Sequence, residues 1–291
     1  MNTQKVDFAI VGGGVTGLWL NVLLARAGFS TIVIEKTALG IQQTLASQGM
    51  IHGGVKYSLS GLVNNHFHTL KSMPARWTKC LSGDDPVDLR DVTILSPQYY
   101  MFSDASLSSK MATFLGSRLL RGHVSPVKLT DFPKAFMSPN FKGNLYVLKD
   151  IVIDARSLVE NLAKDYETRI VKGSPEIVSE QGKITSLIVS DKYRVKAERY
   201  IFAAGIGNQE IISALEMPIK MQNRPLHQVV IRGKNLPDLF AHAVCVRDLG
   251  KPRITFTTHV VGNYKYWYLG GKLAETGVKR SSLDQIKFAK T

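Results

Sequence analysis

The chain has 291 residues, 44% of them hydrophobic, and a mean hydropathy of -0.02. This composition is typical of a globular protein with a sizeable core. The sequence contains no run of 18 apolar residues, so it predicts no membrane-spanning helix. The net charge of +14 can attract nucleic acid, an anionic membrane surface or an acidic substrate. The basic residues are dispersed, however, so we expect no nucleic-acid partner and leave peripheral membrane contact open. Cys80 and Cys245 lack metal-ligand spacing and favour a reducing, cytoplasmic location without a metal site.

The N-terminal residues predict a strand, a helix and a second strand. Residues 6–11 form a short apolar and β-branched run, which is typical of a buried strand. Residues 16–27 are aliphatic and end at Gly28, as a helix would. Residues 30–34 form another apolar run that ends at Glu35. We therefore expect a βαβ unit at the start of the chain.

The rest of the chain predicts helices and strands that alternate between two parts of the fold. We expect helices over residues 59–81, 107–120 and 154–166, a strand over 88–102, a loop-rich stretch over 126–149, strands over 169–172, 184–190, 194–196 and 199–204, and strands with turns from 229 to 271. The pattern predicts a mixed α/β fold with a Rossmann-like domain and an interleaved antiparallel β-sheet domain. The boundaries we expect are 1–85 and 150–220 for the nucleotide-binding domain, and 86–149 and 221–291 for the substrate domain.

The turn after the first strand carries three glycines at the spacing of a dinucleotide-binding motif. Gly12 permits the tight turn, Gly14 lets the backbone approach a pyrophosphate, and Gly17 lets helix and strand pack closely. Val15 and Thr16 follow at the start of the predicted helix. The N-terminal end of a helix offers free N–H groups and a positive dipole to phosphates. These five residues are therefore candidate cofactor-binding residues.

An acidic residue ends the second strand and narrows the choice of nucleotide. Glu35 is placed to accept hydrogen bonds from ribose hydroxyls, and Lys36 follows it. The acid favours a free 2′-hydroxyl over a 2′-phosphate, so NADP is disfavoured. FAD and NAD stay equal on this motif alone.

Two further glycine-containing stretches follow. The first is Ser47-Gln48-Gly49-Met50-Ile51-His52-Gly53-Gly54, and the second is Tyr200-Ile201-Phe202-Ala203-Ala204-Gly205-Ile206-Gly207-Asn208. In the first, a hydroxyl and consecutive backbone N–H groups can bind phosphate, and the glycines let a flat ring lie close to the backbone. In the second, a buried strand ends in small residues that permit close contact.

Together these stretches resemble the FAD-dependent oxidoreductases of the D-amino-acid oxidase and glycerol-3-phosphate dehydrogenase superfamily. The sequence HGGVKY is especially similar to the glycerol-3-phosphate dehydrogenase branch. The resemblance implies that the cofactor is FAD and that residues 47–53 run along its pyrophosphate and under its isoalloxazine. It also implies that Ala203, Ala204 and Gly205 return beside the pyrophosphate.

The resemblance further implies a reaction and a set of substrate residues. We expect hydride transfer to flavin N5 from a small anionic hydroxy or amino substrate, such as a glycerol-3-phosphate-like compound, a 2-hydroxy acid or an amino acid. His52 and His259 are the candidate catalytic residues, because the pKa of histidine suits proton transfer near neutral pH. The electron acceptor, quinone or oxygen, stays open, as does the oligomeric state. Candidate anchors for an anionic group are Lys56, Arg224, Arg232, Arg253 and Lys272, and the candidate aromatic wall is Tyr266 and Tyr268.

Two alternative functions stay open at this point. A flavoenzyme that modifies RNA bases would use the basic surface. A non-catalytic remnant of the flavin fold would fit the C-terminus, since the sequence ends in SSLDQIKFAKT without the final glycine-rich segment that the family resemblance implies. We therefore expect a form that lacks the family's C-terminal segment.

Overall fold

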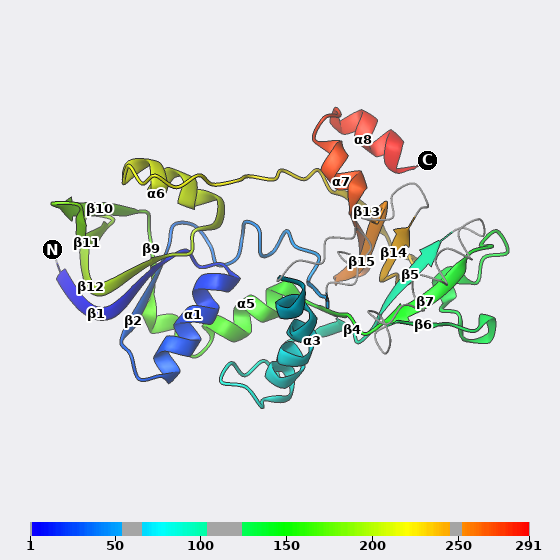
Figure 1. Cartoon of the computed structure of the whole chain (residues 1–291), viewed down its shortest axis with the longest axis horizontal. Helices are drawn as coiled ribbons and strands as arrows, with labels where there is room; N and C mark the ends of the chain where they lie inside the picture. Colours follow the sequence, from blue (N-terminus) through cyan, green and yellow to red (C-terminus); the bar gives the residue numbers. More distant parts are fainter. Residues whose placement is uncertain (1, 54–65, 104–123, 245–251, 291) are drawn as a thin grey trace. The chain divides into compact units, whose positions relative to one another are not determined.

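The computed structural model describes residues 2–53, 66–103, 124–244 and 252–290 (Figure 1). The chain divides into two compact units. The first unit comprises residues 1–47, 79–93 and 155–223, and the second comprises 48–78, 94–154 and 224–291. Residues 48–78 therefore belong to the second compact unit. The boundaries predicted from the sequence place them in the nucleotide-binding domain.

A six-stranded sheet forms the centre of the first unit, in the order β10-β11-β12-β1-β2-β9. The strands are β1 (Asn2–Val11), β2 (Thr31–Glu35), β9 (Ile170–Lys172), β10 (Pro175–Glu180), β11 (Lys183–Val189) and β12 (Tyr193–Phe202). The pairs of β1 with β12, β1 with β2 and β2 with β9 are parallel, and the pairs of β11 with β10 and β12 are antiparallel. This confirms the predicted βαβ start and the mixed α/β class.

The strand β12 shows why part of the prediction is wrong. The sequence predicts two strands, at 194–196 and 199–204, but one strand pairs with β1 from Asn2↔Tyr193 to Val11↔Phe202. The exposed charged residues Glu198 and Arg199 interrupt the apolar pattern without interrupting the backbone pairing. The strand β10 has no counterpart in the prediction, because its residues are all exposed or half-buried and only Ile177 and Val178 give it an apolar run.

Helices cover this sheet. The described helices of the unit are α1 (Val15–Arg26), α5 (Ala155–Ala163) and α6 (Asn208–Ala214), with short 3-10 turns η4 (Glu167–Arg169) and η5 (Gly205–Gly207). Figure 1 shows α1 and α5 side by side, and they are in direct contact. Side chains such as Ile10, Leu18 and Ile32 are almost fully buried, and burial of this kind contributes ~1.5–3 kcal/mol per large aliphatic side chain.

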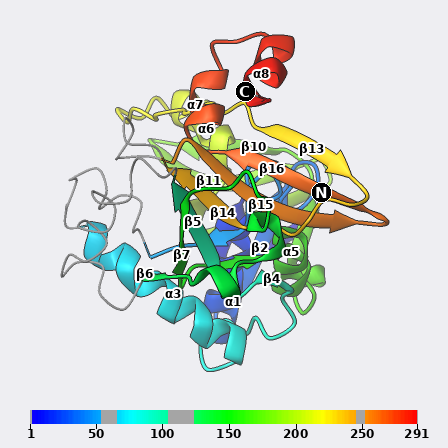
Figure 2. The same cartoon turned by 90° about the vertical axis from the view of Figure 1, so that its right-hand side faces the viewer.

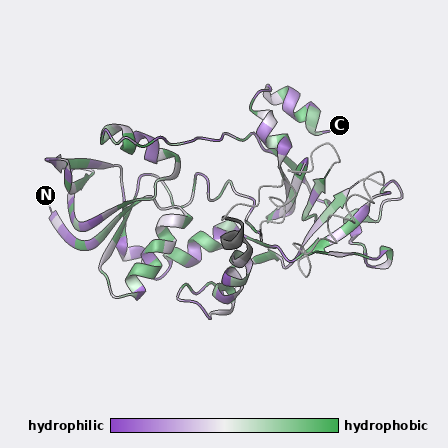
Figure 3. Ribbon diagram, viewed as in Figure 1, coloured by the Kyte–Doolittle hydropathy of each residue, from purple (hydrophilic) through white to green (hydrophobic). Residues whose placement is uncertain are grey.

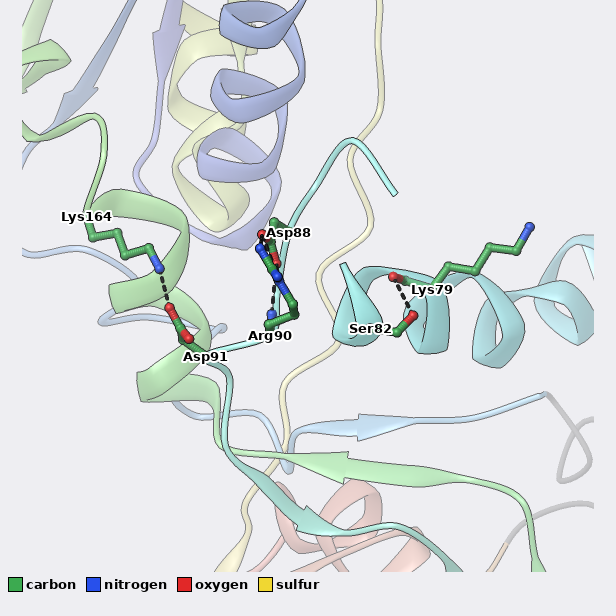
Figure 4. A network of polar contacts seen from close by, with 6 residues as sticks. All are labelled: Lys79, Ser82, Asp88, Arg90, Asp91 and Lys164. Atoms are coloured by element: carbon green, nitrogen blue, oxygen red, sulfur yellow. Dashed lines mark hydrogen bonds and ion pairs between the residues drawn. The ribbon is translucent and has the colours of Figure 1, made fainter. Parts of the chain in front are cut away.

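Polar contacts tie residues 79–93 to α5 within the first unit (Figure 4). Lys164 Nζ on the segment after α5 lies 2.5 Å from Asp91 Oδ2. The Arg90 guanidinium donates to the Asp88 carboxylate at 2.7 Å, and these hydrogen bonds lower the pKa of Asp88 to about 2. All four side chains are at least partly exposed, so these ion pairs contribute little to the folding stability of the unit.

A seven-stranded sheet forms the second unit, in the order β13-β16-β15-β14-β5-β7-β6 (Figure 2). The strands are β5 (Tyr99–Ser103), β6 (Val124–Pro126), β7 (Asn144–Leu148), β13 (Val229–Gly233), β14 (Ala241–Val244), β15 (Ile254–Val261) and β16 (Tyr264–Gly270). Every pair of these described strands is antiparallel except β14 with β5. This confirms the predicted antiparallel sheet.

A second, three-stranded sheet in this unit has the order β3-β8-β4, with β3 (Met50–Ile51), β4 (Ile94–Ser96) and β8 (Ile151–Ile153). The strand predicted at 88–102 is wrong in extent: residues 88–93 are not extended strand, and β4 and β5 are separate strands on either side of Pro97. A proline cannot donate to a strand ladder, which explains the break. The loop-rich stretch predicted at 126–149 also contains β7.

The helices outside the first unit's core are α3 (His66–Ser82), α7 (Lys272–Gly277) and α8 (Ser282–Ala289), with short turns η2 (Leu129–Asp131) and η3 (Lys134–Phe136). The predicted helix at 107–120 lies outside the described residues, as do residues 59–65 of the predicted helix at 59–81. Hydrophobic and hydrophilic residues are interspersed along α8 (Figure 3). Within the described ranges, no helix combines the length and the apolar composition that a membrane crossing requires.

Candidate functional site

The glycine turn of the first unit touches the end of β12 through backbone atoms. Gly12 has φ +113°, and a Cβ atom built there would lie 2.4 Å from the carbonyl oxygen of Ala203 and 2.8 Å from Cα of Ala204. The Ala203 N–H donates to the carbonyl oxygen of Val11 at 2.8 Å. The structure therefore brings together the first and third predicted motifs, and glycine is required at the contact.

The first turn of α1 begins directly after this contact, with the hydroxyl of Thr44 beside it. Gly14 occupies the N-cap position of the helix and, as a glycine, has no side chain to bond to the first turn. The first turn has no acidic residue. A Cβ atom at Gly17 would lie 1.9 Å from the carbonyl oxygen of Gly12, so the helix can approach the turn only because residue 17 is glycine. Thr16 is exposed, and the Val15 N–H donates to Thr44 Oγ1 at 3.0 Å. A helix N-terminus without an acidic residue in its first turn suits an anionic group such as a phosphate.

Glu35 lies at the same turn. Its carboxylate accepts hydrogen bonds from the N–H of Gly13 at 2.7 Å and from the N–H of Thr37 at 3.0 Å. These bonds fix the acid at the end of β2, beside the glycine turn. Lys36 and Ser47, two other predicted cofactor residues of this unit, are exposed.

Several side chains that support the turn were missed by the sequence analysis. Asn208 Oδ1 accepts from the Ala204 N–H at 3.0 Å, and its Nδ2 donates to the carbonyl oxygen of Phe202 at 3.2 Å. Gln43 Oε1 accepts from the Ile206 N–H at 3.2 Å. An asparagine directly after a glycine-rich strand end is a recognised backbone-bonding residue and could have been found. Gln43, like Thr44, comes from a separate segment and gives no local signal.

The predicted flavin segment 48–53 belongs to the second unit and is held there at both ends. Gly49 has φ +65°, and a Cβ atom there would lie 2.0 Å from the carbonyl oxygen of Ile153. Met50 and Ile51 pair with β8, and the Gly53 N–H donates to Oδ1 of the buried Asp150 at 3.0 Å. Asp150 was not singled out from the sequence, because it lies 97 residues away from its partner.

The side chain of Gln48 connects this segment to the large sheet. Its Nε2 donates to the carbonyl oxygens of Tyr268 at 2.9 Å and Thr255 at 3.1 Å, and it lies 3.3 Å from Thr257 Oγ1. A Cβ atom at Gly270 would lie 2.5 Å from Gln48 Oε1, so the glycine makes room for the amide. The Gln48 side chain is therefore packed on β15 and β16.

His259 lies on the face of the sheet that Gln48 covers. Its ring centroid is 4.5 Å from that of Tyr268, and its Nε2 lies 3.1 Å from Thr257 Oγ1. Burial lowers the pKa of His259 below its ordinary value, and the nearby carboxylate of Asp154 opposes part of this effect. His52, the other predicted catalytic residue, is half-buried in the segment after β3.

The predicted anchors and aromatic residues are distributed unequally over the second unit. The strand register places Arg232, Tyr266 and His259 side by side on one face, and the Arg232 guanidinium lies 4.5 Å from the Tyr264 ring centroid. Arg224 is 3.7 Å from Glu275 in an ion pair, and Arg253 is exposed. Lys272 begins α7, and Lys56 lies outside the described residues.

The residues of the first unit fit part of FAD. The N-terminal end of α1, which has no acidic residue, suits a pyrophosphate, and the carboxylate beside the turn suits a ribose. At Gly12 the backbone comes so close to Ala203 that a Cβ atom would intrude. These three features match the chemistry of the adenosine diphosphate half of the cofactor.

Comparisons with known proteins agree with this fit. The family of FAD dependent oxidoreductases matches residues 7–280. The probable FAD-dependent oxidoreductase PA4991 of Pseudomonas aeruginosa is 39% identical over 290 residues, which cover 98% of this chain and 73% of that protein.

Solved structures show the same fold. The crystal structure of PA4991 has a TM-score of 0.82 at 35% identity and covers all of this chain and 72% of that one. Glycine oxidase from Bacillus cereus has a TM-score of 0.67 at 18% identity, with 92% and 71% of the two chains covered. The FAD-bound L-alpha-glycerophosphate oxidase from Mycoplasma pneumoniae has a TM-score of 0.62 at 16% identity, with 92% and 71% covered. The chain therefore belongs to the family of FAD dependent oxidoreductases, with FAD as its cofactor.

Proposed function

We propose that this enzyme oxidises a small anionic compound that carries a hydroxyl or an amino group on the carbon that loses hydride. One observation carries the proposal. Gln48, in the predicted flavin segment, hydrogen-bonds directly to the two strands that carry His259 and Tyr268. This bond joins the segment expected under the flavin to a sheet face with the polar and aromatic groups of a substrate site.

The residues proposed to hold FAD are those that the glycine motifs and the family resemblance indicate. In the first unit, the residues proposed to hold FAD are Gly12, Gly14, Val15, Thr16, Gly17, Glu35, Lys36, Ser47, Ala203, Ala204 and Gly205. In the second unit, the segment from Gln48 to Gly53 would contact the flavin. Bound FAD supplies the acceptor for the hydride. The protein would contribute by holding the substrate carbon in place and by excluding water.

The substrate class follows from the side chains on the second unit's sheet face. Arg232 offers a guanidinium for a carboxylate or phosphate, and Tyr264 and Tyr266 offer flat apolar walls. His259 offers a ring nitrogen to a hydroxyl or amine, either as an acid/base or as an orienting group. Glycine oxidase and glycerophosphate oxidase share the fold, and each is named for a small compound that carries a carboxylate or a phosphate. That shared chemistry supports an anionic substrate without selecting one.

Anaerobic bleaching of the bound flavin tests the proposal. The full chain is loaded with FAD and mixed with amino acids, 2-hydroxy acids and glycerol 3-phosphate, each paired with the analogue that lacks the amino or hydroxyl group. We expect saturable bleaching by at least one member of a pair and none by its analogue. FAD-loaded protein that no compound in the panel bleaches would refute the proposed substrate class.

The electron acceptor and the location are proposals of the same kind. We propose a cytoplasmic enzyme whose net charge of +14 permits contact with anionic membranes, and whose reduced flavin passes electrons to quinone or oxygen. Reoxidation rates with dissolved oxygen and with a soluble quinone, measured on substrate-reduced protein, would separate the two acceptors.

A further inference from the structure

The hydroxyl of Thr257 lies between the Gln48 amide and the His259 ring. Thr257 Oγ1 is 3.3 Å from Gln48 Nε2 and 3.1 Å from His259 Nε2. Thr257 has no exposed surface, so water does not compete for its hydroxyl. The direction of these two hydrogen bonds therefore depends on the three side chains and on the backbone groups that the Gln48 amide contacts.

Two carbonyl groups fix the direction of the Gln48 amide. Its nitrogen lies 2.9 Å from the carbonyl oxygen of Tyr268 and 3.1 Å from that of Thr255. Carbonyl oxygens only accept hydrogen bonds, so the NH₂ group must face them. Because an amide nitrogen only donates, Thr257 Oγ1 can receive a hydrogen from Gln48 but cannot give one to it.

The hydrogen of the Thr257 hydroxyl must then point elsewhere. In the part of the chain that the structure describes, the other polar side-chain atom within hydrogen-bond distance of this oxygen is His259 Nε2. The hydroxyl donates to that nitrogen, which must therefore carry no hydrogen. A neutral ring in this state has its proton on Nδ1. The Tyr268 ring packs against the imidazole, with the centroids 4.5 Å apart and the planes tilted by 36°.

We propose that Gln48 and Thr257 are positioning residues that hold His259 as the neutral tautomer protonated on Nδ1, so that it donates a hydrogen bond to the substrate. The imidazolium form would have to donate from Nε2 to Thr257, and the threonine hydrogen would then lose its acceptor. A buried donor without an acceptor is unfavourable, so the arrangement selects against a charged ring.

The substrate contact follows from the other ring nitrogen. Among the described residues, His259 Nδ1 has no hydrogen-bond partner, and its N–H is available to a carboxylate, hydroxyl or amine of a bound compound. This half of the inference rests on the proposed function, whereas the tautomer does not depend on it. By its residue type alone His259 could act as an acid/base or as an orienting residue, and the geometry favours orientation.

Nuclear magnetic resonance of the full chain, with ¹⁵N-labelled histidine, tests the tautomer without any substrate. The chain has seven histidines, and the His259 signals are identified by their loss in His259→Gln. We expect the wild-type ring to show a protonated Nδ1 and an unprotonated Nε2. In Thr257→Val the ratio of the tautomers should move toward Nε2–H by about tenfold or more, the factor for one lost buried hydrogen bond.

Matched variants separate a positioning role from a structural one. Thr257→Ser keeps the hydroxyl and should restore the wild-type tautomer. Thr255→Val is the control on the same strand and face, because Thr255 Oγ1 lies 3.1 Å from His242 Nδ1; it should alter the His242 signals and leave those of His259 unchanged. If Thr257→Val does not fold, Gln48→Met should produce the same direction of change from a different segment. A wild-type ring protonated on Nε2, or a ratio unaffected by Thr257→Val and Gln48→Met, would overturn the proposal.

A kinetic comparison tests the substrate contact separately. Glutamine at position 259 can still donate from its amide, whereas leucine cannot. We expect His259→Gln to keep a flavin-reduction rate at least about tenfold above that of His259→Leu. Equal loss in both variants, with the Nδ1–H tautomer present in the wild type, would refute the donor role while leaving the tautomer assignment intact.

Discussion

Replacing Gly12 with alanine tests the contact on which the cofactor cradle depends. The added Cβ atom would meet the carbonyl oxygen of Ala203 at 2.4 Å, its carbonyl carbon at 2.6 Å and Cα of Ala204 at 2.8 Å. All three are backbone atoms, which cannot rotate away as a side chain can. Relief requires the turn and the end of β12 to move apart, and this breaks the 2.8 Å hydrogen bond from the Ala203 N–H to Val11.

The magnitude follows from the terms that are lost. Backbone strain at a positive φ costs ~1–2 kcal/mol for a residue with a side chain. The lost hydrogen bond and the displaced packing add about 2 kcal/mol. Gly28→Ala is the matched control, because Gly28 has φ +90° but no atom within 4 Å of an added methyl group, so it carries the strain alone. We expect the unfolding midpoint of Gly12→Ala to lie roughly 4–8 °C below that of Gly28→Ala.

Thermal unfolding followed by circular dichroism, without added FAD, measures the difference in stability. Flavin absorbance per protein after loading with FAD measures how much cofactor each variant binds. We expect Gly28→Ala to bind a normal amount of FAD and Gly12→Ala to bind little. The reasoning is refuted if the two variants unfold at the same temperature and retain the same amount of FAD.

Three further predictions concern the acids and the histidine. Glu35→Ala should weaken FAD binding by about 10- to 100-fold, since charge-assisted bonds at the turn are lost; fluorescence titration measures this, and binding as tight as wild type would show that the acid contributes nothing. Asp150→Ala should remove the acceptor of the Gly53 N–H and lower the unfolding free energy by ~1–3 kcal/mol in a urea titration, whereas Asp150→Asn, which still accepts, should lose less. The pKa of His259 is lowered, so the unfolded chain binds its proton first as the pH falls below the ordinary value of 6.5. Folding stability should therefore decrease with falling pH until the folded-state pKa is passed, and His259→Gln should reduce this dependence; an identical pH profile in both proteins would contradict it.

The sequence predicted the parts of the fold whose signals are local. The glycine turn, the first helix and the acid at the end of β2 follow one another between Gly12 and Glu35, and the structure contains each of them in order. Their fit to a dinucleotide could be predicted because Gly12, Gly14 and Gly17 each answer a specific backbone requirement, whereas the choice of FAD over NAD rested on the family resemblance.

The parts that were missed depend on contacts between distant residues. Gln48 bonds to strands more than 200 residues later in the chain, and nothing near position 48 indicates them. Asp150 and Thr257 likewise acquire their roles only when strands from different segments are paired. The long strand β12 was divided in the prediction because exposed charged residues hide a pairing that only β1 determines.

The anaerobic reduction rate of bound flavin by a small anionic amino or hydroxy compound, compared in wild type and His259→Leu, tests the central claim most directly. Both proteins should bind equal amounts of FAD, because His259 is not among the residues proposed to hold the cofactor. We predict saturable reduction in the wild type and a rate lower by about tenfold or more in the variant. Reduction of the variant at the wild-type rate, or no reduction of FAD-loaded wild type by any such compound, would contradict the account.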